Sequence, residues 1–399
     1  MPLRVALVTY STKPRGGVVH TLALAEALAA KGTDVEVIAL GDPSKGFYRS
    51  VDVPCHVIEA PAPAATLTER VFASLDALAD GLARTGERLA PVLHTQDCIA
   101  ARAACRVRDG GAPVTVVRTV HHVDDFTTPA LVECQQRAIV EPDRVLVVSK
   151  TWQRTLLDDH GVDAEVVPNG VDLPRFEHFP GTAVVDALRS RVGATGRFLV
   201  LAVGGIEPRK GSDHLIRSLA RLRDLVDEPP VLAVVGGHSF QDHRAYRQSV
   251  LEEMASLGLR LGTDVVLVGT VPDEELPAWY HAADVLAFPS INEGWGLAVL
   301  EAMAAGLPVV ATDIPVLREY LASGSNALLV TPGDDSALAA ALRAVMTNAS
   351  LGRRLAAAGR RLVTGYGWDV SAERHLDVYR RLSPVQGLSP AQGAGDRRS

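Results

Sequence analysis

The chain has 399 residues, 47% of them hydrophobic, and a formal net charge of −7 at pH 7. This length exceeds that of one ordinary domain, so we expect two domains, each with its own core. The negative charge argues against nucleic acid as a partner, and no apolar run approaches the roughly 20 residues of a membrane-spanning helix.

The first residues lead directly into an apolar strand and lack the pattern of a secretory signal peptide. The four cysteines show no C-x-x-C spacing, which suits buried thiols in a reducing compartment. We therefore predict a cytoplasmic protein without a transmembrane segment.

Residues 3–39 predict a strand, a glycine-containing loop, a helix and a second strand. The loop lacks the G-x-G-x-x-G pattern of dinucleotide-binding proteins, which argues against an oxidoreductase. Its adjacent glycines, Gly16 and Gly17, would let the backbone approach a ligand closely. A simple tight turn is the alternative.

Basic residues occur at positions 102, 106 and 108, after an amphipathic helix predicted over 64–89. Peripheral contact with a membrane is one interpretation of this cluster. Acidic residues nearby favour a solvated surface instead.

A predicted buried strand at 114–120 runs into two histidines and two aspartates, His121, His122, Asp124 and Asp125. Successive side chains of an extended chain point to opposite faces, so adjacent histidines do not readily bind one ion. We therefore expect no metal site here.

The second half begins with a strand at 198–203, followed by a loop over 204–211 that contains Arg209 and Lys210. The loop lacks the residue order of a Walker P-loop. Two cations beside a leaving diphosphate would stabilise the negative charge that grows there. The alternative is an exposed basic helix start.

Residues 285–311 predict a strand, a turn, a helix and a strand, which is a parallel βαβ unit. Gly306 fits the end of the helix, and Pro308 cannot continue it. Free N–H groups and the positive end of the helix dipole make the helix start an anion site. Glu293 precedes the helix and Glu301 lies within it, about 80° apart if both were helical, so they should not form a carboxylate pair.

Residues 289–310, PSINEGWGLAVLEAMAAGLPVV, resemble the signature of glycosyltransferase family 4. Residues 166–172 resemble the end of that family's first domain, and 204–211 resemble its phosphate loop, although many members have an arginine where Gly205 stands. The resemblance implies an α/β fold of the GT-B type, with two Rossmann-like, doubly wound parallel-sheet domains facing a central cleft.

The implied domains are an acceptor-side domain over 1–174, a linker over 175–196 and a nucleotide-sugar-binding domain over 197–365. A helix over 366–382 would cross back to the first domain. We expect residues 383–399 to form a disordered tail.

By resemblance, the chain is a retaining glycosyltransferase that takes a hexose-type sugar from a nucleoside-diphosphate sugar, without a cofactor or metal. The acceptor would attack on the face that the diphosphate leaves. Glu293 would hold sugar hydroxyls, Glu301 the ribose hydroxyls, and His121 or else His122 would face the sugar. The implied catalytic residues are His121, Glu293, Arg209 and Lys210, and the implied substrate-binding residues are Gly16, Gly17, Gly294, Trp295, Gly296, Leu297 and Glu301.

Alternatives within the same fold are a sugar phosphorylase, a nucleotide-sugar epimerase and a catalytically silent nucleotide-sugar-binding protein. The acceptor could be a small molecule, a glycan or a lipid. The sequence does not choose between uridine and guanosine as the donor nucleoside, nor does it name the sugar or the acceptor.

Overall fold

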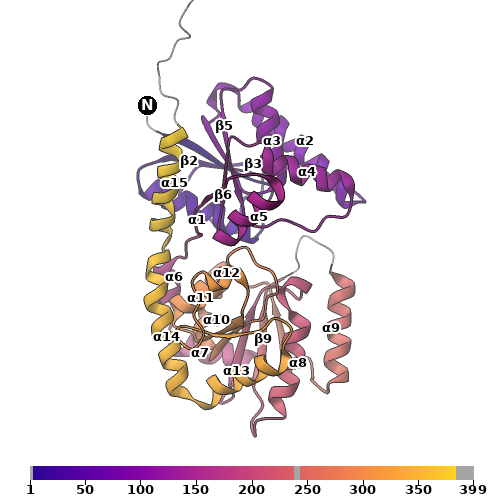
Figure 1. The fold of residues 1–399 in the computed structure, drawn as a ribbon, viewed down its shortest axis with the longest axis vertical. Helices are drawn as coiled ribbons and strands as arrows, with labels where there is room; N and C mark the ends of the chain where they lie inside the picture. Colours follow the sequence, from indigo (N-terminus) through magenta and orange to yellow (C-terminus); the bar gives the residue numbers. More distant parts are fainter. Residues whose placement is uncertain (1–2, 238–242, 383–399) are drawn as a thin grey trace, which may run out of the picture.

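The computed structural model describes residues 3–237 and 243–382, so the predicted tail at 383–399 lies outside the described residues. Two α/β domains are stacked one above the other (Figure 1). Within the described residues the first domain has a seven-stranded parallel sheet in the order β3-β2-β1-β4-β5-β6-β7. Its strands are β1 Arg4–Thr9, β2 Asp34–Gly41, β3 Cys55–Glu59, β4 Val92–Thr95, β5 Thr115–Val120, β6 Arg144–Val147 and β7 Glu165–Val166. Its helices are α1 Gly16–Ala30, α2 Leu67–Thr85, η1 Gly86–Arg88, α3 Cys98–Asp109, α4 Pro129–Val140 and α5 Lys150–His160.

The first sheet is apolar on both faces because helices cover both. Val5 and Leu7 of β1 pack in a core with α1, whereas Ala6 and Val8 pack in a core with α2 and α3. This alternation between two cores explains why the strand reads as a continuous apolar run.

The second domain has a six-stranded parallel sheet in the order β10-β9-β8-β11-β12-β13 within the described residues. Its strands are β8 Leu199–Val203, β9 Val231–Val235, β10 Val265–Gly269, β11 Val285–Phe288, β12 Val309–Thr312 and β13 Leu328–Val330. Its helices are η2 Pro208–Lys210, α8 Ser212–Arg223, α9 Arg244–Ser256, η3 Asp273–Glu275, α10 Leu276–Ala282, α11 Leu297–Ala305, α12 Pro315–Arg318, α13 Asp335–Thr347 and α14 Ala349–Val363. The expected pair of parallel-sheet domains is confirmed.

Two segments connect the domains. Helices α6 Leu173–Glu177 and α7 Thr182–Arg191 lie in the connection and pack on α10 or α11. After η4 Thr364–Tyr366, helix α15 Trp368–Leu382 returns to the first domain and packs on α1 (Figure 1). None of the helices in the described ranges is long and apolar enough to cross a membrane.

The strand orders determine where a ligand can bind. In each sheet the order reverses at one point, between β1 and β4 in the first domain and between β8 and β11 in the second. Loops that follow such neighbouring strands diverge and leave a crevice at the carboxyl edge of the sheet. The site residues described below follow β4 and β5 in one domain, and β8 and β11 in the other.

Candidate active site

Three of the predicted site residues form one charged cluster in the second domain. The Lys210 Nζ lies 2.6 Å from a carboxylate oxygen of Glu293, and the Arg209 guanidinium lies 3.3 Å from the same oxygen. The Glu293 side chain is 8% exposed and that of Lys210 17%, whereas Arg209 is half-exposed. The structure therefore brings together the loop after β8 and the turn after β11.

The ionised form of Glu293 is stabilised by its neighbours. Burial alone would raise the pKa of this carboxyl, but the charges of Lys210 and Arg209 outweigh burial, and the pKa is lowered. Glu207 also pairs with Arg209, at 3.2 Å. Both cations are thus already held by carboxylates, and a phosphate that binds here must compete for them.

The start of α11 provides neutral hydrogen-bond donors beside this cluster. Gly296, the residue before the helix, has a left-handed backbone with φ of 90°, which favours glycine. Within the described residues, the backbone N–H groups of residues 294–297 have no hydrogen-bond acceptor. The Trp295 side chain is buried against Tyr320 and Tyr366. Any contribution of Trp295 to binding must therefore come from its backbone.

Glu301 lies in a separate polar pocket between the domains. The pocket is also lined by Leu297, Asp273, Arg175, Arg49 and Tyr48. Burial raises the pKa of Glu301, although the Tyr280 hydroxyl, which donates a hydrogen bond at 2.5 Å, and the charge of Arg175 act in the other direction. Glu293 and Glu301 thus lie in different surroundings, each with its own polar partners.

His121 reaches the charged cluster from the first domain. Its carbonyl oxygen lies against Gly294, where only a hydrogen atom fits. The His121 Nε2 lies 3.0 Å from the Oε1 of Gln96, the residue that follows β4. Burial, together with the nearby His20 and Arg118, holds the pKa of His121 well below its usual value. A neutral ring that donates from Nε2 leaves Nδ1 as an acceptor.

The other candidates on this side are arranged differently. The His122 side chain is 56% exposed and lies 3.5 Å from Asp124. Of the two histidines, His121 is therefore the one that the structure places at Gly294. No group of three or more histidine, cysteine, aspartate or glutamate side chains within the described ranges is arranged to hold a metal ion. Metal independence remains a prediction.

The position of Gly16 and Gly17 differs from expectation. We expected both in a loop, but α1 begins at Gly16, after an extended Arg15. The N–H groups in the first turn of this helix have no acceptor within the helix and are open to a ligand. A Cβ on Gly17 would contact the carbonyl of Gln96, so this turn lies close to the partner of His121.

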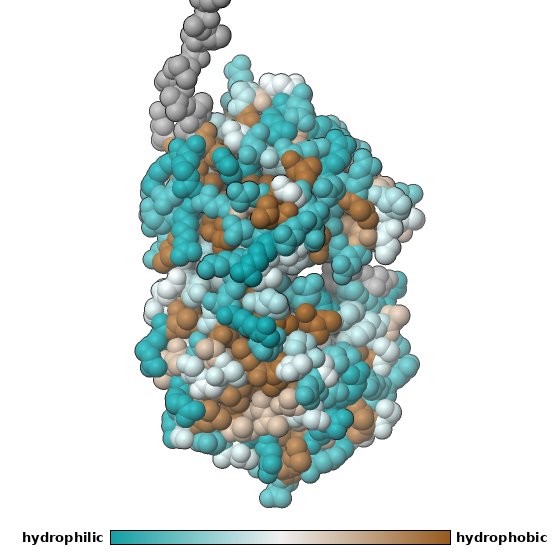
Figure 2. All heavy atoms as spheres, in the orientation of Figure 1, coloured by the Kyte–Doolittle hydropathy of each residue, from teal (hydrophilic) through white to brown (hydrophobic). Residues whose placement is uncertain are grey.

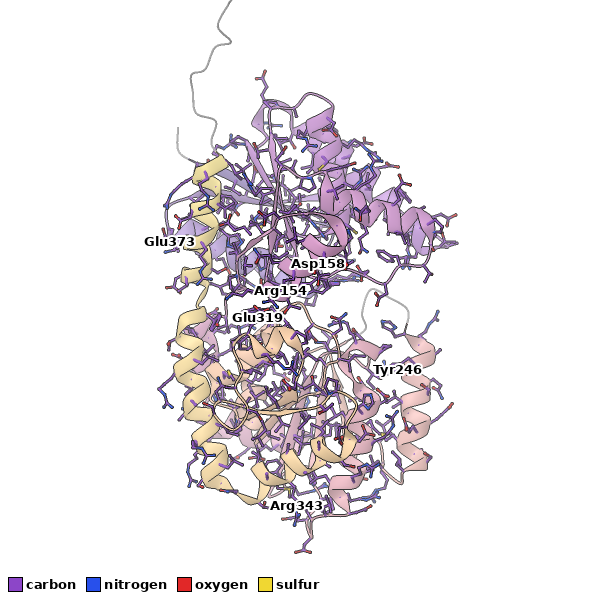
Figure 3. The ribbon with its side chains drawn as sticks, in the orientation of Figure 1. Arg154, Asp158, Tyr246, Glu319, Arg343 and Glu373 are labelled. Atoms are coloured by element: carbon purple, nitrogen blue, oxygen red, sulfur yellow. The ribbon has the colours of Figure 1, made fainter. Side chains whose placement is uncertain are left out.

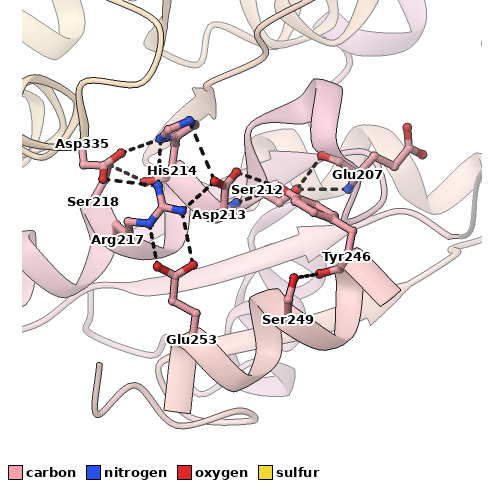
Figure 4. Close-up of polar contacts among 10 residues, drawn as sticks. All are labelled: Glu207, Ser212, Asp213, His214, Arg217, Ser218, Tyr246, Ser249, Glu253 and Asp335. Carbon is pink, nitrogen blue, oxygen red and sulfur yellow. Dashed lines mark hydrogen bonds and ion pairs between the residues drawn. The ribbon is translucent and has the colours of Figure 1, made fainter. Parts of the chain in front are cut away.

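A polar network anchors the helix that follows the two cations. Arg217 of α8 bonds Asp213 at 2.7 Å and Glu253 of α9 at 2.6 Å, and His214 bonds Asp335 of α13 at 2.8 Å (Figure 4). These contacts fix α8 to two neighbouring helices. The loop that carries Arg209 and Lys210 therefore ends on a firmly held helix.

Comparison of the sequence with known proteins identifies the family of this chain. Residues 14–175 match the model for Glycosyltransferase Family 4, and residues 185–362 match the model for Glycosyl transferases group 1. The chain is 31% identical to the D-inositol 3-phosphate glycosyltransferase of Kineococcus radiotolerans, over 99% of this chain and 98% of that protein. This chain belongs to glycosyltransferase family 4.

A second relative and two solved structures agree with this family assignment. The phosphatidyl-myo-inositol mannosyltransferase of Mycobacterium leprae is 30% identical, covering 96% of this chain and 97% of that protein. Among solved structures, Anabaena HepE in complex with UDP and glucose superposes with a TM-score of 0.80 at 20% identity, covering 95% of this chain and all of that one. Sucrose-phosphate synthase from Thermosynechococcus elongatus superposes with a TM-score of 0.79 at 23% identity, covering 95% and 99%. These structures confirm the GT-B fold, and the chain is a glycosyltransferase.

Several residues of this glycosyltransferase site were missed from the sequence. Gln96 and Tyr280 carry no motif of their own, nor does Trp152, whose indole N–H donates to the backbone carbonyl of Glu293 at 3.2 Å. Gln96 follows a strand, and its position at the carboxyl end of β4 was the one available signal. Tyr280 and Trp152 were not recognisable because their partners lie 21 and 141 positions away in the sequence.

Gly294→Ala in this glycosyltransferase should lower turnover by at least about tenfold, because the added Cβ would overlap the His121 carbonyl oxygen and hold the domains apart. Steady-state kinetics with a thermal melt checks this. Gly365→Ala is the matched control, because no atom lies within 4 Å of its added Cβ. Equal turnover of the two variants would show that the contact with His121 is unimportant.

Proposed function

We propose that this glycosyltransferase moves a hexose-type sugar from a nucleoside-diphosphate sugar to a hydroxyl acceptor, with retention and without a metal ion. The observation that carries the proposal is the cluster of Arg209, Lys210 and Glu293 beside the unpaired N–H groups of residues 294–297. Cations and a helix start favour a diphosphate. A buried carboxylate among them favours hydroxyl groups of the sugar.

The pocket at Glu301 supports a nucleoside beside this diphosphate. Glu301 accepts from Tyr280 through Oε2, and no described residue donates to its Oε1. That oxygen is available to a ribose hydroxyl. The pocket also contains Asp273 and Arg175, which form an ion pair at 3.0 Å. Asp273 offers hydrogen-bond acceptors and Arg175 offers donors, and the edge of a nucleobase carries groups of both kinds.

In the proposed mechanism the acceptor attacks on the face from which the diphosphate leaves. The sugar–phosphate bond breaks, negative charge grows on the leaving oxygen, and Lys210 and Arg209 stabilise it. The leaving oxygen takes the proton of the acceptor hydroxyl, so no protein nucleophile is needed. His121 faces the sugar from the first domain, and closure excludes water.

The names of two relatives support a proposal for the acceptor class. The Kineococcus radiotolerans relative is named a D-inositol 3-phosphate glycosyltransferase, and the Mycobacterium leprae relative a phosphatidyl-myo-inositol mannosyltransferase. We therefore propose a polyol hydroxyl as the acceptor and inositol phosphates as the first compounds to test. Phosphorolysis, epimerisation and binding without transfer are the competing outcomes of that assay.

The deciding experiment is a thermal-shift panel of UDP, GDP and ADP, with NAD as the control. A ligand that binds only the folded chain stabilises it by about 2.7 kcal/mol at 100 times its Kd, which raises the melting temperature. A shift with one diphosphate names the donor nucleoside. No shift with any of the three would argue against a nucleotide-sugar donor.

Glu301→Ala is expected to weaken binding of the free nucleoside diphosphate more than Glu293→Ala does, because Glu301 lies in the pocket assigned to the nucleoside. Calorimetry with the diphosphate from the panel measures both affinities. Glu293→Ala should instead impair use of the sugar. The reverse order of affinities would contradict both assignments.

EDTA should leave transfer unchanged, because the proposed stabilisation of the leaving group comes from side chains and backbone N–H groups. Activity is compared before and after chelation and again with added Mg²⁺ or Mn²⁺. A loss that a divalent ion restores would reject the metal-independent mechanism.

A further inference from the structure

The two domains are joined beside the active site by a carboxylate that bonds only across their boundary. Glu319 follows α12 in the second domain. Its two oxygens accept hydrogen bonds from the backbone N–H of Lys150, at 2.9 Å, and from the backbone N–H and hydroxyl of Thr151, at 2.8 and 2.7 Å. Figure 3 shows Glu319 at the top of the lower domain, facing the helix that carries Arg154 and Asp158.

The contact is electrostatically favourable. Lys150 and Thr151 form the first turn of α5, where backbone N–H groups lack partners within the helix. A negative charge at this end of a helix is stabilised by the helix dipole. Ser149 caps the remaining donor of the turn, the N–H of Trp152. Glu319 thus supplies the acceptors that the sequence of α5 does not.

Glu319 has no such partner within its own domain. Within the described residues, every hydrogen bond of its carboxylate goes to α5, and it forms no ion pair. Separating the domains would break all three bonds together. The contact therefore favours the arrangement of the structure, in which the two domains touch on the left of the face shown in Figure 2.

The same turn of α5 also contacts the site. Trp152 donates its indole N–H to the backbone carbonyl of Glu293, at 3.2 Å, and its side chain is 7% exposed. Glu293 in turn holds Lys210. The contact of Glu319 with α5 thus also holds the backbone of Glu293 in place. Glu293 directly precedes Gly294, which meets the His121 carbonyl.

We infer that Glu319 is a positioning residue that latches the two domains closed through the amino terminus of α5 and so sets the geometry of Glu293 and His121. Glu319 contacts neither donor nor acceptor. Its contribution is to the fraction of enzyme that is closed when the donor is bound. The kinetic part of this inference rests on the proposed function, and the structural part does not.

The test uses Glu319→Gln, which keeps the shape but removes the charge, and Thr151→Val, which removes the hydroxyl donor. Asp158→Asn is the matched control, because it removes one carboxylate from an exposed position of the same helix. Small-angle scattering measures the closed population of each full-length variant. Transfer kinetics with the nucleotide sugar chosen by the panel measure kcat and KM, and hydrolysis of the donor measures access of water.

Glu319→Gln should lower kcat by about tenfold with little change in donor KM, raise the ratio of hydrolysis to transfer, and shift the scattering toward an open form. The double variant with Thr151→Val should be no worse than the more impaired single variant, because both disrupt one contact. Melting temperatures identify any variant that fails to fold. If Glu319→Gln fails to fold, Thr151→Val tests the same contact from the other domain.

Wild-type scattering and kcat in Glu319→Gln would overturn the latch. If wild-type enzyme transfers no sugar from any nucleotide sugar, the proposed function fails, but the scattering comparison still decides whether Glu319 closes the domains. An equal effect of Asp158→Asn would show that general charge on α5, rather than this contact, controls closure.

Discussion

Replacing Lys210 by methionine is expected to lower turnover by about 10²-fold or more, because a nearly isosteric change removes one of the two cations proposed to stabilise the leaving diphosphate. The Lys210 Nζ is largely buried, bonds Glu293 at 2.6 Å and lies 5.0 Å from the centre of the Phe288 ring. Water cannot readily replace a charge held in such surroundings. The variant would also leave the Glu293 carboxylate buried with only half-exposed Arg209 beside it.

Steady-state kinetics with saturating donor and acceptor measures the loss. Lys45→Met is the control, because Lys45 is 81% exposed and pairs with Asp42 on the surface. Arg209→Ala tests the second cation, for which we also expect about a 10²-fold loss if it stabilises the developing charge. A loss of tenfold or less in either variant would remove that side chain from the stabilisation of the leaving group.

Acid is expected to destabilise the fold steeply below pH 6.5, because four histidines are buried in neutral form near the contact between α1 and α15. Burial lowers the pKa of His20 to about 3 and that of His375 to about 4, and it holds the pKa values of His94 and His121 well below the usual 6.5. All four rings are linked by ring contacts: His20 lies edge-to-face with His121 and with His375, and His375 is in tilted contact with His94.

The direction of the effect follows from proton linkage. A histidine whose folded pKa is lowered remains neutral in the folded chain while the unfolded chain takes up a proton. Stability is therefore full above the unfolded pKa and falls as pH drops from about 6.5 toward the folded values. Each such histidine contributes up to roughly 1.4 kcal/mol of lost stability per pH unit in that window.

Urea unfolding at pH 7, 6 and 5 measures the slope. His20→Leu should make the slope shallower by about one proton. Neither ring nitrogen of His20 has a hydrogen bond within the described residues, and Asn169 lies nearby without completing one. His178→Gln, at an exposed position, should leave the slope unchanged. An equal slope in the wild type and in His20→Leu would show that His20 is protonated in the folded chain.

The local sequence determined the elements around the site. The apolar run of β11, the glycine turn and the helix ended by Gly306 were all predicted, and the structure gives Gly306 a left-handed backbone with φ of 74°. Such signals are readable because the turn, the helix and its ends depend on neighbouring residues. The resemblance of residues 289–310 to glycosyltransferase family 4 supplied the fold, which short-range patterns alone did not.

Only the tertiary structure decided how the charged residues meet. Lys210 and Glu293 are 83 positions apart, and they pair because β8 and β11 are neighbours at the point where the strand order reverses. Glu319 and Thr151 are 168 positions apart and meet across the boundary between the two domains. Neither of these sequence separations produces a periodic pattern that could be recognised in the chain. Strand order and the packing of one domain against the other thus created the contacts on which the proposed chemistry rests.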